Sequence, residues 1–154
     1  MRLTKQTNYA FRILMYCGAN VGRKSRVPEI ARAFSVSEPF LFKIVQLLSE
    51  GGLVQTTRGR GGGISLSRSG EEITLLDVVK VTEDGFHMAE CFEGGVAECP
   101  LVDHCALHTA LGRALGAFMD VLDETTIDDL VRARPGLNEL IGLPVEGAAI
   151  HAAN

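Results

Sequence analysis

The chain has 154 residues, of which 46% are hydrophobic and 22% are charged, a composition that is ordinary for a soluble globular protein. No apolar run approaches the roughly eighteen residues that a membrane span needs, and Arg2, Lys5 and Arg12 interrupt the apolar stretch that a signal peptide requires. We therefore expect a cytoplasmic protein with no membrane partner.

The net charge of −4 is distributed unevenly along the chain. Residues 1–70 carry eleven Lys and Arg against three Asp and Glu, a net charge of +8, and residues 71–154 carry four against sixteen, a net charge of −12. This asymmetry predicts an N-terminal region that binds a polyanion and a separate acidic region, although a basic face can also be merely solvated.

The basic half begins with three predicted helices. Residues 4–19 repeat apolar residues at helical spacing, and Cys17 lies on that stripe, where we expect it to pack as a small hydrophobe. A short second helix begins at Pro28. A third follows Ser37, which is a good N-cap, and ends at residues 51–52. Two short helices joined by a tight turn are typical of a helix-turn-helix.

The third predicted helix has an apolar side and a mixed polar and aromatic side. The apolar side is expected to be buried, and it comprises Leu41, Ile44, Val45 and Leu48. The other side would face the major groove of DNA, where Gln46 can read adenine and Lys43 can contact a phosphate or a guanine. The residues expected to bind DNA from this region are Ser37, Pro39, Phe40, Lys43 and Gln46.

A β-hairpin is predicted next, with strands over residues 53–57 and 64–67 and a tip rich in Arg and Gly over residues 58–63. The glycines allow the backbone to approach a phosphate chain, and Arg58 and Arg60 can contact phosphate or enter a minor groove. This favours the DNA-binding wing of a winged helix. A nucleotide-binding loop, which would need a different glycine pattern, and a solvated turn are the alternatives.

The acidic half predicts a short helix over residues 74–81 and a long one from about residue 106 to 123. The long helix carries an apolar stripe that needs a partner, and a second copy of the chain is the economical one. The residues expected at this dimer interface are Leu111, Leu115, Phe118 and Leu122. A short helix follows Thr126, and residues 137–140 could add one more turn.

Three of the four cysteines, Cys91, Cys99 and Cys105, lie in one acidic loop. An odd number of cysteines with no sign of export argues against disulfides, and crowded thiolates select zinc, copper(I) or iron–sulfur clusters. His108 follows three positions after the last of them, so a structural Cys3His zinc site also fits. Free thiols are the remaining alternative.

The opening residues 1–9, the wing residues 58–64, the segment 77–79 and the three spaced cysteines together resemble the Rrf2 family of bacterial iron–sulfur transcription regulators. The resemblance extends to about Gly142, and the cysteine segments are most similar to the rhizobial iron regulators of that family. It implies a homodimer in which Cys91, Cys99 and Cys105 hold an iron–sulfur cluster. It also implies DNA binding through residues 37–51 and the wing.

The resemblance leaves the fourth cluster ligand open. One branch of the family, which holds a 2Fe–2S cluster, places a histidine where this chain has His108. The nitric-oxide-sensing branch uses an aspartate of the partner subunit, and the matching residue here is Asn8, a poor replacement for a carboxylate. The iron-regulator branch is associated with a 4Fe–4S cluster, which we therefore favour over 2Fe–2S. His104 adjoins Cys105 and is less suited, and we expect no ligand role for His87 or His151.

The sequence thus predicts a mainly α fold, a winged helix-turn-helix with a small β-hairpin wing plus a long dimerisation helix. The expected divisions are a DNA-binding domain at 1–82, a cluster-binding loop at 83–105, the dimerisation helix and C-terminal helix at 106–142, and a disordered tail at 143–154.

The function expected from these features is repression of iron-uptake genes, by a homodimer that binds a double-stranded DNA operator and senses iron through its cluster. The alternatives are a nitric-oxide or cluster-assembly sensor of the same family, and a DNA-binding dimer with structural zinc. No paired carboxylates, nucleophile motif or cofactor loop accompany the cysteines, so we expect neither an enzyme nor a small-molecule substrate.

Overall fold

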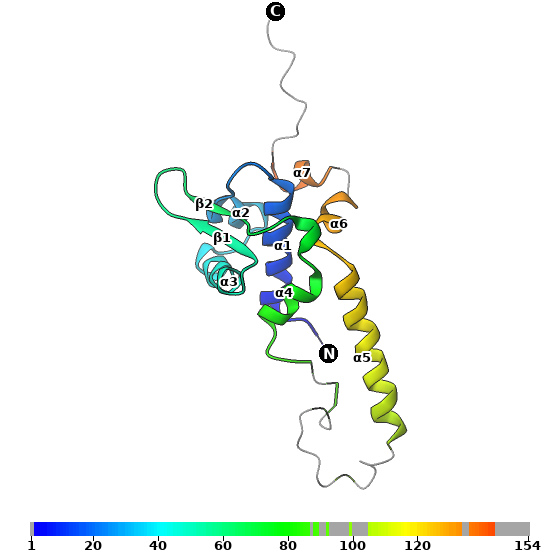
Figure 1. Cartoon of the computed structure of the whole chain (residues 1–154). Helices are drawn as coiled ribbons and strands as arrows, with labels where there is room; N and C mark the ends of the chain where they lie inside the picture. The colour runs from blue at the N-terminus through cyan, green and yellow to red at the C-terminus, as the bar shows by residue number, and fades with distance from the viewer. Residues whose placement is uncertain are drawn as a thin grey trace, which may run out of the picture.

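Helix α1 (Lys5–Ala19) lies at the centre of the fold, and the other elements surround it (Figure 1). The structure is a computed structural model, and it describes residues 2–86, 88–89, 92, 99, 105–133 and 136–143. The predicted disordered tail falls outside these residues from position 144 onward.

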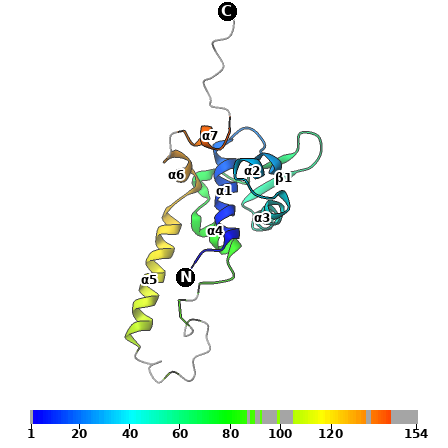
Figure 2. The same cartoon turned by 180° about the vertical axis from the view of Figure 1, so that it is seen from behind.

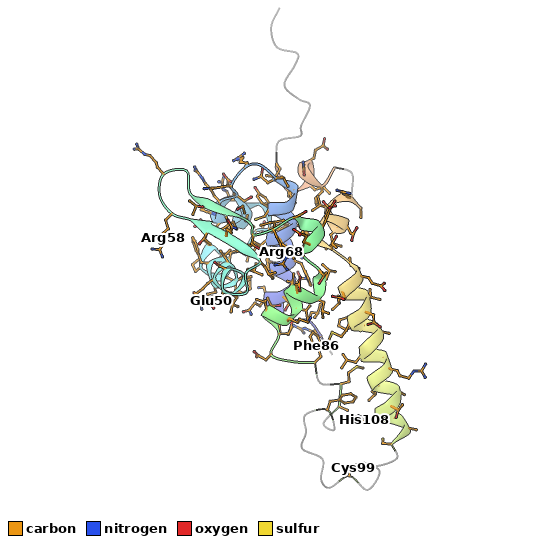
Figure 3. The ribbon with its side chains drawn as sticks, viewed as in Figure 1. Glu50, Arg58, Arg68, Phe86, Cys99 and His108 are labelled. Atoms are coloured by element: carbon orange, nitrogen blue, oxygen red, sulfur yellow. The ribbon has the colours of Figure 1, made fainter. Side chains whose placement is uncertain are left out.

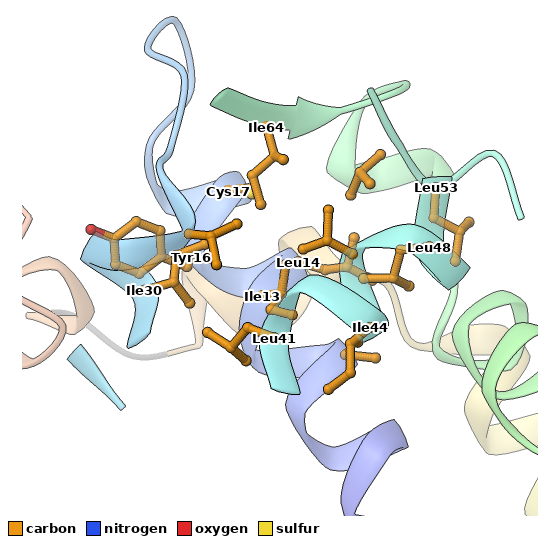
Figure 4. Close-up of a cluster of buried hydrophobic side chains, with 14 of the residues drawn as sticks. Ile13, Leu14, Tyr16, Cys17, Ile30, Leu41, Ile44, Leu48, Leu53 and Ile64 are labelled. Carbon is orange, nitrogen blue, oxygen red and sulfur yellow. The ribbon is translucent and has the colours of Figure 1, made fainter. Parts of the chain in front are cut away.

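The start and the buried side of α1 follow from its sequence. Thr4 caps the helix, because its hydroxyl accepts a hydrogen bond from the backbone N–H of Thr7 at 3.2 Å. The residues that the helical spacing placed in the core are all buried, namely Ala10, Ile13, Leu14 and Cys17. Figure 4 shows several of them at the middle of the hydrophobic core.

Helices α2 (Val27–Ala33) and α3 (Glu38–Glu50) form the predicted helix-turn-helix. Pro28 lies in the first turn of α2, where its missing N–H costs no hydrogen bond. The apolar stripe of α3 is buried as predicted, and it comprises Leu41, Ile44, Val45 and Leu48. These side chains join those of α1 in the core, which fixes α3 with its opposite side toward solvent.

Strands β1 (Val54–Thr57) and β2 (Gly63–Leu66) pair antiparallel and confirm the predicted hairpin, with strand ends within one residue of those expected. The base of the hairpin is tied to the segment before α2. The backbone N–H of Ser25 donates to the carbonyl of Ile64 at 2.9 Å, and the N–H of Ile64 donates back to the carbonyl of Ser25 at 2.8 Å.

A short turn, η1 (Gly70–Glu72), leads into helix α4 (Leu75–Thr82), which was also predicted. An ion pair between Arg68 and Asp77 at 2.8 Å joins the chain after the wing to the first turn of α4. The end of α3 approaches α4 so closely that a Cβ on Gly51 would lie 2.5 Å from a methyl group of Val81. A larger residue where α3 stops would therefore have to displace the Val81 side chain.

Helix α5 (Ala106–Glu124) runs along one side and extends beyond the other helices, whereas α6 (Ile127–Arg132) and α7 (Leu137–Leu140) return to α1 (Figures 1 and 2). The backbone N–H of Ile127 donates to the carbonyl of Ile73 at 2.9 Å, and the Ile127 side chain is fully buried. The segment after α5 thus contributes to the core of the N-terminal half.

The described fold is mainly α with one two-stranded hairpin, which confirms the predicted winged helix-turn-helix with a long additional helix. Among the helices that the structure describes, none combines the length and the apolar character needed to cross a membrane. Two regions outside this core carry the predicted functional residues: the outer side of α3 with the wing, and the start of α5 with Cys99 and Cys105.

Candidate functional site

The outer side of α3 presents a continuous polar stripe with one exposed aromatic ring. Of the residues predicted to bind DNA, Ser37, Pro39, Lys43 and Gln46 are exposed. Ser37 occupies the N-cap position, and its hydroxyl makes no capping hydrogen bond. The Gln46 amide donates to the carboxylate of Glu50 at 2.9 Å, so Gln46 must exchange this exposed hydrogen bond to read a base.

Phe40, which the sequence placed on the exposed side, is half-buried. Its ring meets the ring of Tyr9 edge to face at a centroid distance of 5.4 Å, and the Lys5 ammonium lies 5.3 Å from the Phe40 centroid. Phe40 therefore anchors the start of α3 to α1. The aromatic ring that does face solvent is Phe42, which is 54% exposed.

Sequence reasoning missed Phe42 although a signal was present. Phe42 follows Pro39 by three positions and precedes Gln46 by four, the spacing of residues on one helical face. Phe42 was not predicted to face solvent because a phenylalanine beside an apolar stripe more often lies in the core than on the surface.

The wing carries the second group of predicted DNA-binding residues. Arg58 and Arg60 are both exposed, and Figure 3 shows Arg58 projecting from the hairpin on the side of the molecule where α3 and Glu50 lie. No ion pair within the described ranges involves Arg58, Arg60 or Lys43. Their charges are therefore available to a polyanion such as the phosphate chain of DNA.

Cys99 and His108 lie at the other end of the molecule, near the start of α5 (Figure 3). Cys105 is the N-cap of α5, and its sulfur accepts a hydrogen bond from the backbone N–H of His108 at 3.4 Å. The sulfur thus sits at the positive end of the helix dipole, which favours negative charge. The third expected ligand, Cys91, and the neighbouring His104 and His87 lie outside the described residues, as does His151.

His108 lies in the first turn of α5, and its ring stacks on Phe92 with the centroids 4.5 Å apart and the planes 15° apart. Cys99 and Cys105 are half-buried, and Asn8 is exposed on the first turn of α1. Thiol sulfur and imidazole nitrogen are donors that suit zinc or iron–sulfur clusters, so the chemistry of this set fits a soft metal centre. Within the part of the chain that the structure describes, no three His, Cys, Asp or Glu side chains lie close enough together to hold one metal ion.

Cys17 belongs to a different environment from the other cysteines. Its side chain is 4% exposed in the core, and burial raises the pKa of the Cys17 thiol to about 12. A neutral thiol is a poor metal ligand. The prediction that Cys17 packs as a small hydrophobe is confirmed.

Helix α5 carries two apolar stripes rather than one. The predicted dimer residues Leu111, Leu115 and Phe118 are half-buried and Leu122 is buried, and the ring of Phe118 lies 6.0 Å from that of Phe86. A second stripe is exposed along its whole length and has a seven-residue repeat, and it comprises Leu107, Ala110, Ala114, Ala117 and Val121. Sequence reasoning missed this stripe because alanine gives a weak apolar signal.

A protein-family model described as "Rrf2: Iron-dependent Transcriptional regulator" matches residues 3–133 of the chain. The chain is 66% identical over 143 residues to Protein aau3 of Rhizobium meliloti (strain 1021), and the match covers 93% of each sequence. It is 43% identical over 142 residues to the HTH-type transcriptional regulator NsrR of Geobacillus kaustophilus (strain HTA426), which covers 92% of this chain and 97% of that protein.

Solved structures are similar over most of the chain as well. CymR (YrzC), the global cysteine regulator of B. subtilis, aligns with a TM-score of 0.71 at 25% identity, over 88% of this chain and 99% of that one. IscR of T. potens aligns with a TM-score of 0.70 at 20% identity, over 86% of this chain and 88% of that one, a likeness of fold.

Proposed function

We propose that this chain, which belongs to the Rrf2 family of transcriptional regulators, is an iron-responsive repressor of iron-uptake genes. Its membership of that family makes it a regulator and not an enzyme. It binds a double-stranded DNA operator as a homodimer and senses iron through a cysteine-ligated iron–sulfur cluster. The observation that carries the proposal is the separation of the exposed outer side of α3 and the wing, at one end, from Cys99, Cys105 and His108 near the start of α5, at the other.

The DNA-binding part of the proposal rests on α3 and the wing. The outer side of α3 enters the major groove, with Lys43 and Gln46 toward the bases, while Arg58 and Arg60 contact the backbone or the minor groove. The charges of all these cationic side chains are unpaired within the described ranges, as a phosphate-binding surface requires.

The dimer forms through α5. The stripe that contains Leu107 and Val121 is exposed, with 65% and 61% of those side chains accessible, and a second copy of α5 would cover it. The heptad spacing suits two helices that pack at a small crossing angle. Leu111, Leu115 and Phe118 extend the same interface at its edge. A symmetric dimer would then place two α3 helices on half-sites about one turn of DNA apart.

Cys91, Cys99 and Cys105 would hold the cluster, with 4Fe–4S favoured over 2Fe–2S, and His108 is the candidate for the fourth ligand. Asn8 of the partner subunit is the weaker candidate, because an amide is a poor ligand for iron. A bound cluster supplies a centre whose assembly depends on the iron supply. Cys105 connects that centre to dimerisation, because it is the residue at which α5 begins.

Cluster and DNA are linked ligands in this proposal. Phe118 of α5 contacts Phe86, which follows α4, and α4 packs on α1 beside α3. A change in the coordination of Cys105 would shift α5 and alter the spacing of the two recognition helices. If both ligands favour the same conformer, DNA strengthens cluster binding by a certain factor. Loss of the cluster must then weaken operator binding by the same factor.

The test is purification without oxygen, with iron, acid-labile sulfide and zinc measured beside the absorption spectrum and operator affinity. Roughly equal iron and sulfide, together with weaker operator binding after cluster removal, supports the proposal. A 2Fe–2S spectrum would make His108 the expected fourth ligand. Equal operator binding with and without the cluster contradicts iron sensing.

A structural zinc site is the second candidate, favoured by a donor set of three cysteines and His108 that would close a tetrahedral shell. One zinc per chain, no sulfide and no colour would establish it. A nitric-oxide or cluster-assembly sensor uses the same residues, and the signal that alters operator affinity of the loaded protein distinguishes these sensors from an iron sensor.

A further inference from the structure

Phe42 stands at the edge of an apolar groove between α3 and the wing. The groove has a volume of about 680 Å³, and Val27, Pro28, Val45 and Ile64 contribute its apolar walls. The Phe42 ring is 54% exposed, the largest apolar side chain on the outer side of α3. A single exposed hydrophobic residue would need no explanation, but this one continues an apolar surface.

The rim of the groove is basic. Arg26 and Arg60 line it, and Lys43 adjoins Phe42 in the sequence. No Asp or Glu is among the described residues that line the groove. An apolar centre within a cationic rim complements the major groove of DNA, where the thymine methyl groups are apolar and the flanking phosphates are anionic.

The position of Phe42 along α3 also suits contact with bases. It lies in the N-terminal half of the helix, and the N-terminal residues of a recognition helix reach the base edges. Gln46 follows one turn later on the same face. Phe42 and Gln46 would therefore meet neighbouring base pairs.

We infer that Phe42 is a specificity-determining residue that packs against the 5-methyl group of a thymine in the operator, next to the adenine that Gln46 reads. The inference rests on the proposed function, in which α3 enters the major groove. It predicts a half-site with adjacent A·T pairs at the position where α3 docks. Loss of the methyl contact should weaken binding about fourfold, as expected for one methyl group buried from water.

The experiment uses the full-length protein and its operator, with each thymine replaced singly by deoxyuridine, which removes only the methyl group. Dissociation constants are measured for the wild type, Phe42→Ala and Val21→Ala. Val21 is a matched control, because its side chain is 84% exposed and does not line the groove. For the wild type and Val21→Ala, deoxyuridine at one thymine of each half-site should weaken binding about fourfold. Phe42→Ala should bind that deoxyuridine duplex and the unmodified operator with equal affinity.

Two results would overturn the inference. In one, the wild type binds every deoxyuridine duplex as well as the operator. In the other, Phe42→Ala keeps the full methyl dependence, which would mean that another residue reads the methyl group or that the groove serves a protein partner. Either result would leave DNA binding intact, whereas a wild type that binds no duplex specifically would refute the proposed function itself.

Discussion

The carboxylate of Glu83, the residue after α4, accepts a hydrogen bond from the backbone N–H of Thr4 at 2.7 Å, directly before the first residue of α1. The hydroxyl of the fully buried Thr7 donates to the same oxygen and accepts a hydrogen bond from the hydroxyl of Thr82 at 2.9 Å. This junction ties the end of α4, where the cysteine loop begins, to the helix on which α3 packs.

The junction makes stability depend on pH. Burial acts to raise the pKa of Glu83, but the hydrogen bonds from Thr7 and Thr4 outweigh it, so the pKa is lowered in the folded protein. A lowered pKa means that the carboxylate stabilises the fold above the pKa of the unfolded chain, and that this contribution disappears as the pH falls through the folded pKa.

Glu83→Gln should therefore lower the free energy of unfolding by about 1 kcal/mol at neutral pH, a value that allows for solvent screening of a partly exposed group. The difference from the wild type should shrink below about pH 4. Urea unfolding of the metal-free chain at several pH values measures this difference in the free energy of unfolding. Asp84→Asn is the control, since Asp84 is exposed and lies beside the junction of Thr4, Thr7, Thr82 and Glu83 without belonging to it, and this change should alter stability little. A pH-independent difference would contradict this account.

Cys105→Ser should abolish metal retention while keeping α5 folded, because serine is a better N-cap than cysteine. Cys17→Ala should keep the full metal content and lose about 1 kcal/mol of stability through the small cavity it leaves. Iron and zinc content, measured beside thermal unfolding, separates the two effects. Metal retained by Cys105→Ser, or lost from Cys17→Ala, would refute the assignment of ligands.

Arg60→Ala should weaken binding to all DNA sequences alike and reduce the slope of log affinity against log salt by about two, about one for each Arg60 of the dimer. The exposed Arg113 on α5 provides a charge-matched control, and Arg113→Ala should leave both affinity and slope near the wild-type values. Titrations at four salt concentrations with operator and random duplexes make the comparison. A loss confined to the operator would instead indicate that Arg60 reads a base.

Gly63→Ala should distort the wing, because a Cβ there would lie 2.5 Å from the carbonyl oxygen of Ser25, which pairs with β2. We expect a loss of about 1–3 kcal/mol in the free energy of unfolding, together with weaker DNA binding. Gly116→Ala is the control, because nothing lies within 4 Å of the added Cβ and alanine favours the helix. If thermal unfolding showed Gly63→Ala to be at least as stable as Gly116→Ala, the close approach of Gly63 to the carbonyl of Ser25 would not be what requires glycine there.

Val121→Glu should weaken dimerisation at least about tenfold, because each copy would bury an unpaired carboxylate at the α5 interface. The monomer should remain folded, since Val121 is 61% exposed. Sedimentation at several protein concentrations measures the dimer, and circular dichroism checks the fold. Val21→Glu makes the same substitution at a more exposed valine outside α5. An unchanged dimer in Val121→Glu would exclude the exposed stripe as the interface.

The sequence alone predicted the elements that depend on near neighbours. Helical spacing placed Ile13, Leu14 and Leu41 in the core, and all three are buried. Alternating residues predicted the hairpin, and Thr126 marked the start of a short helix, α6, where the structure shows a capping box between Thr126 and Asp129. These features are local, because each depends on the spacing of residues within one short segment of the chain.

The tertiary structure decided which apolar side chains are covered. Phe40 and Phe42 differ little in sequence context, but Tyr9 packs on the first and leaves the second to solvent. In the same way, α4 and Phe86 partly cover one stripe of α5 and leave the stripe with Val121 exposed. Periodicity defines the faces of a helix, but which face is buried depends on elements far away in the sequence, and only the folded chain brings these together.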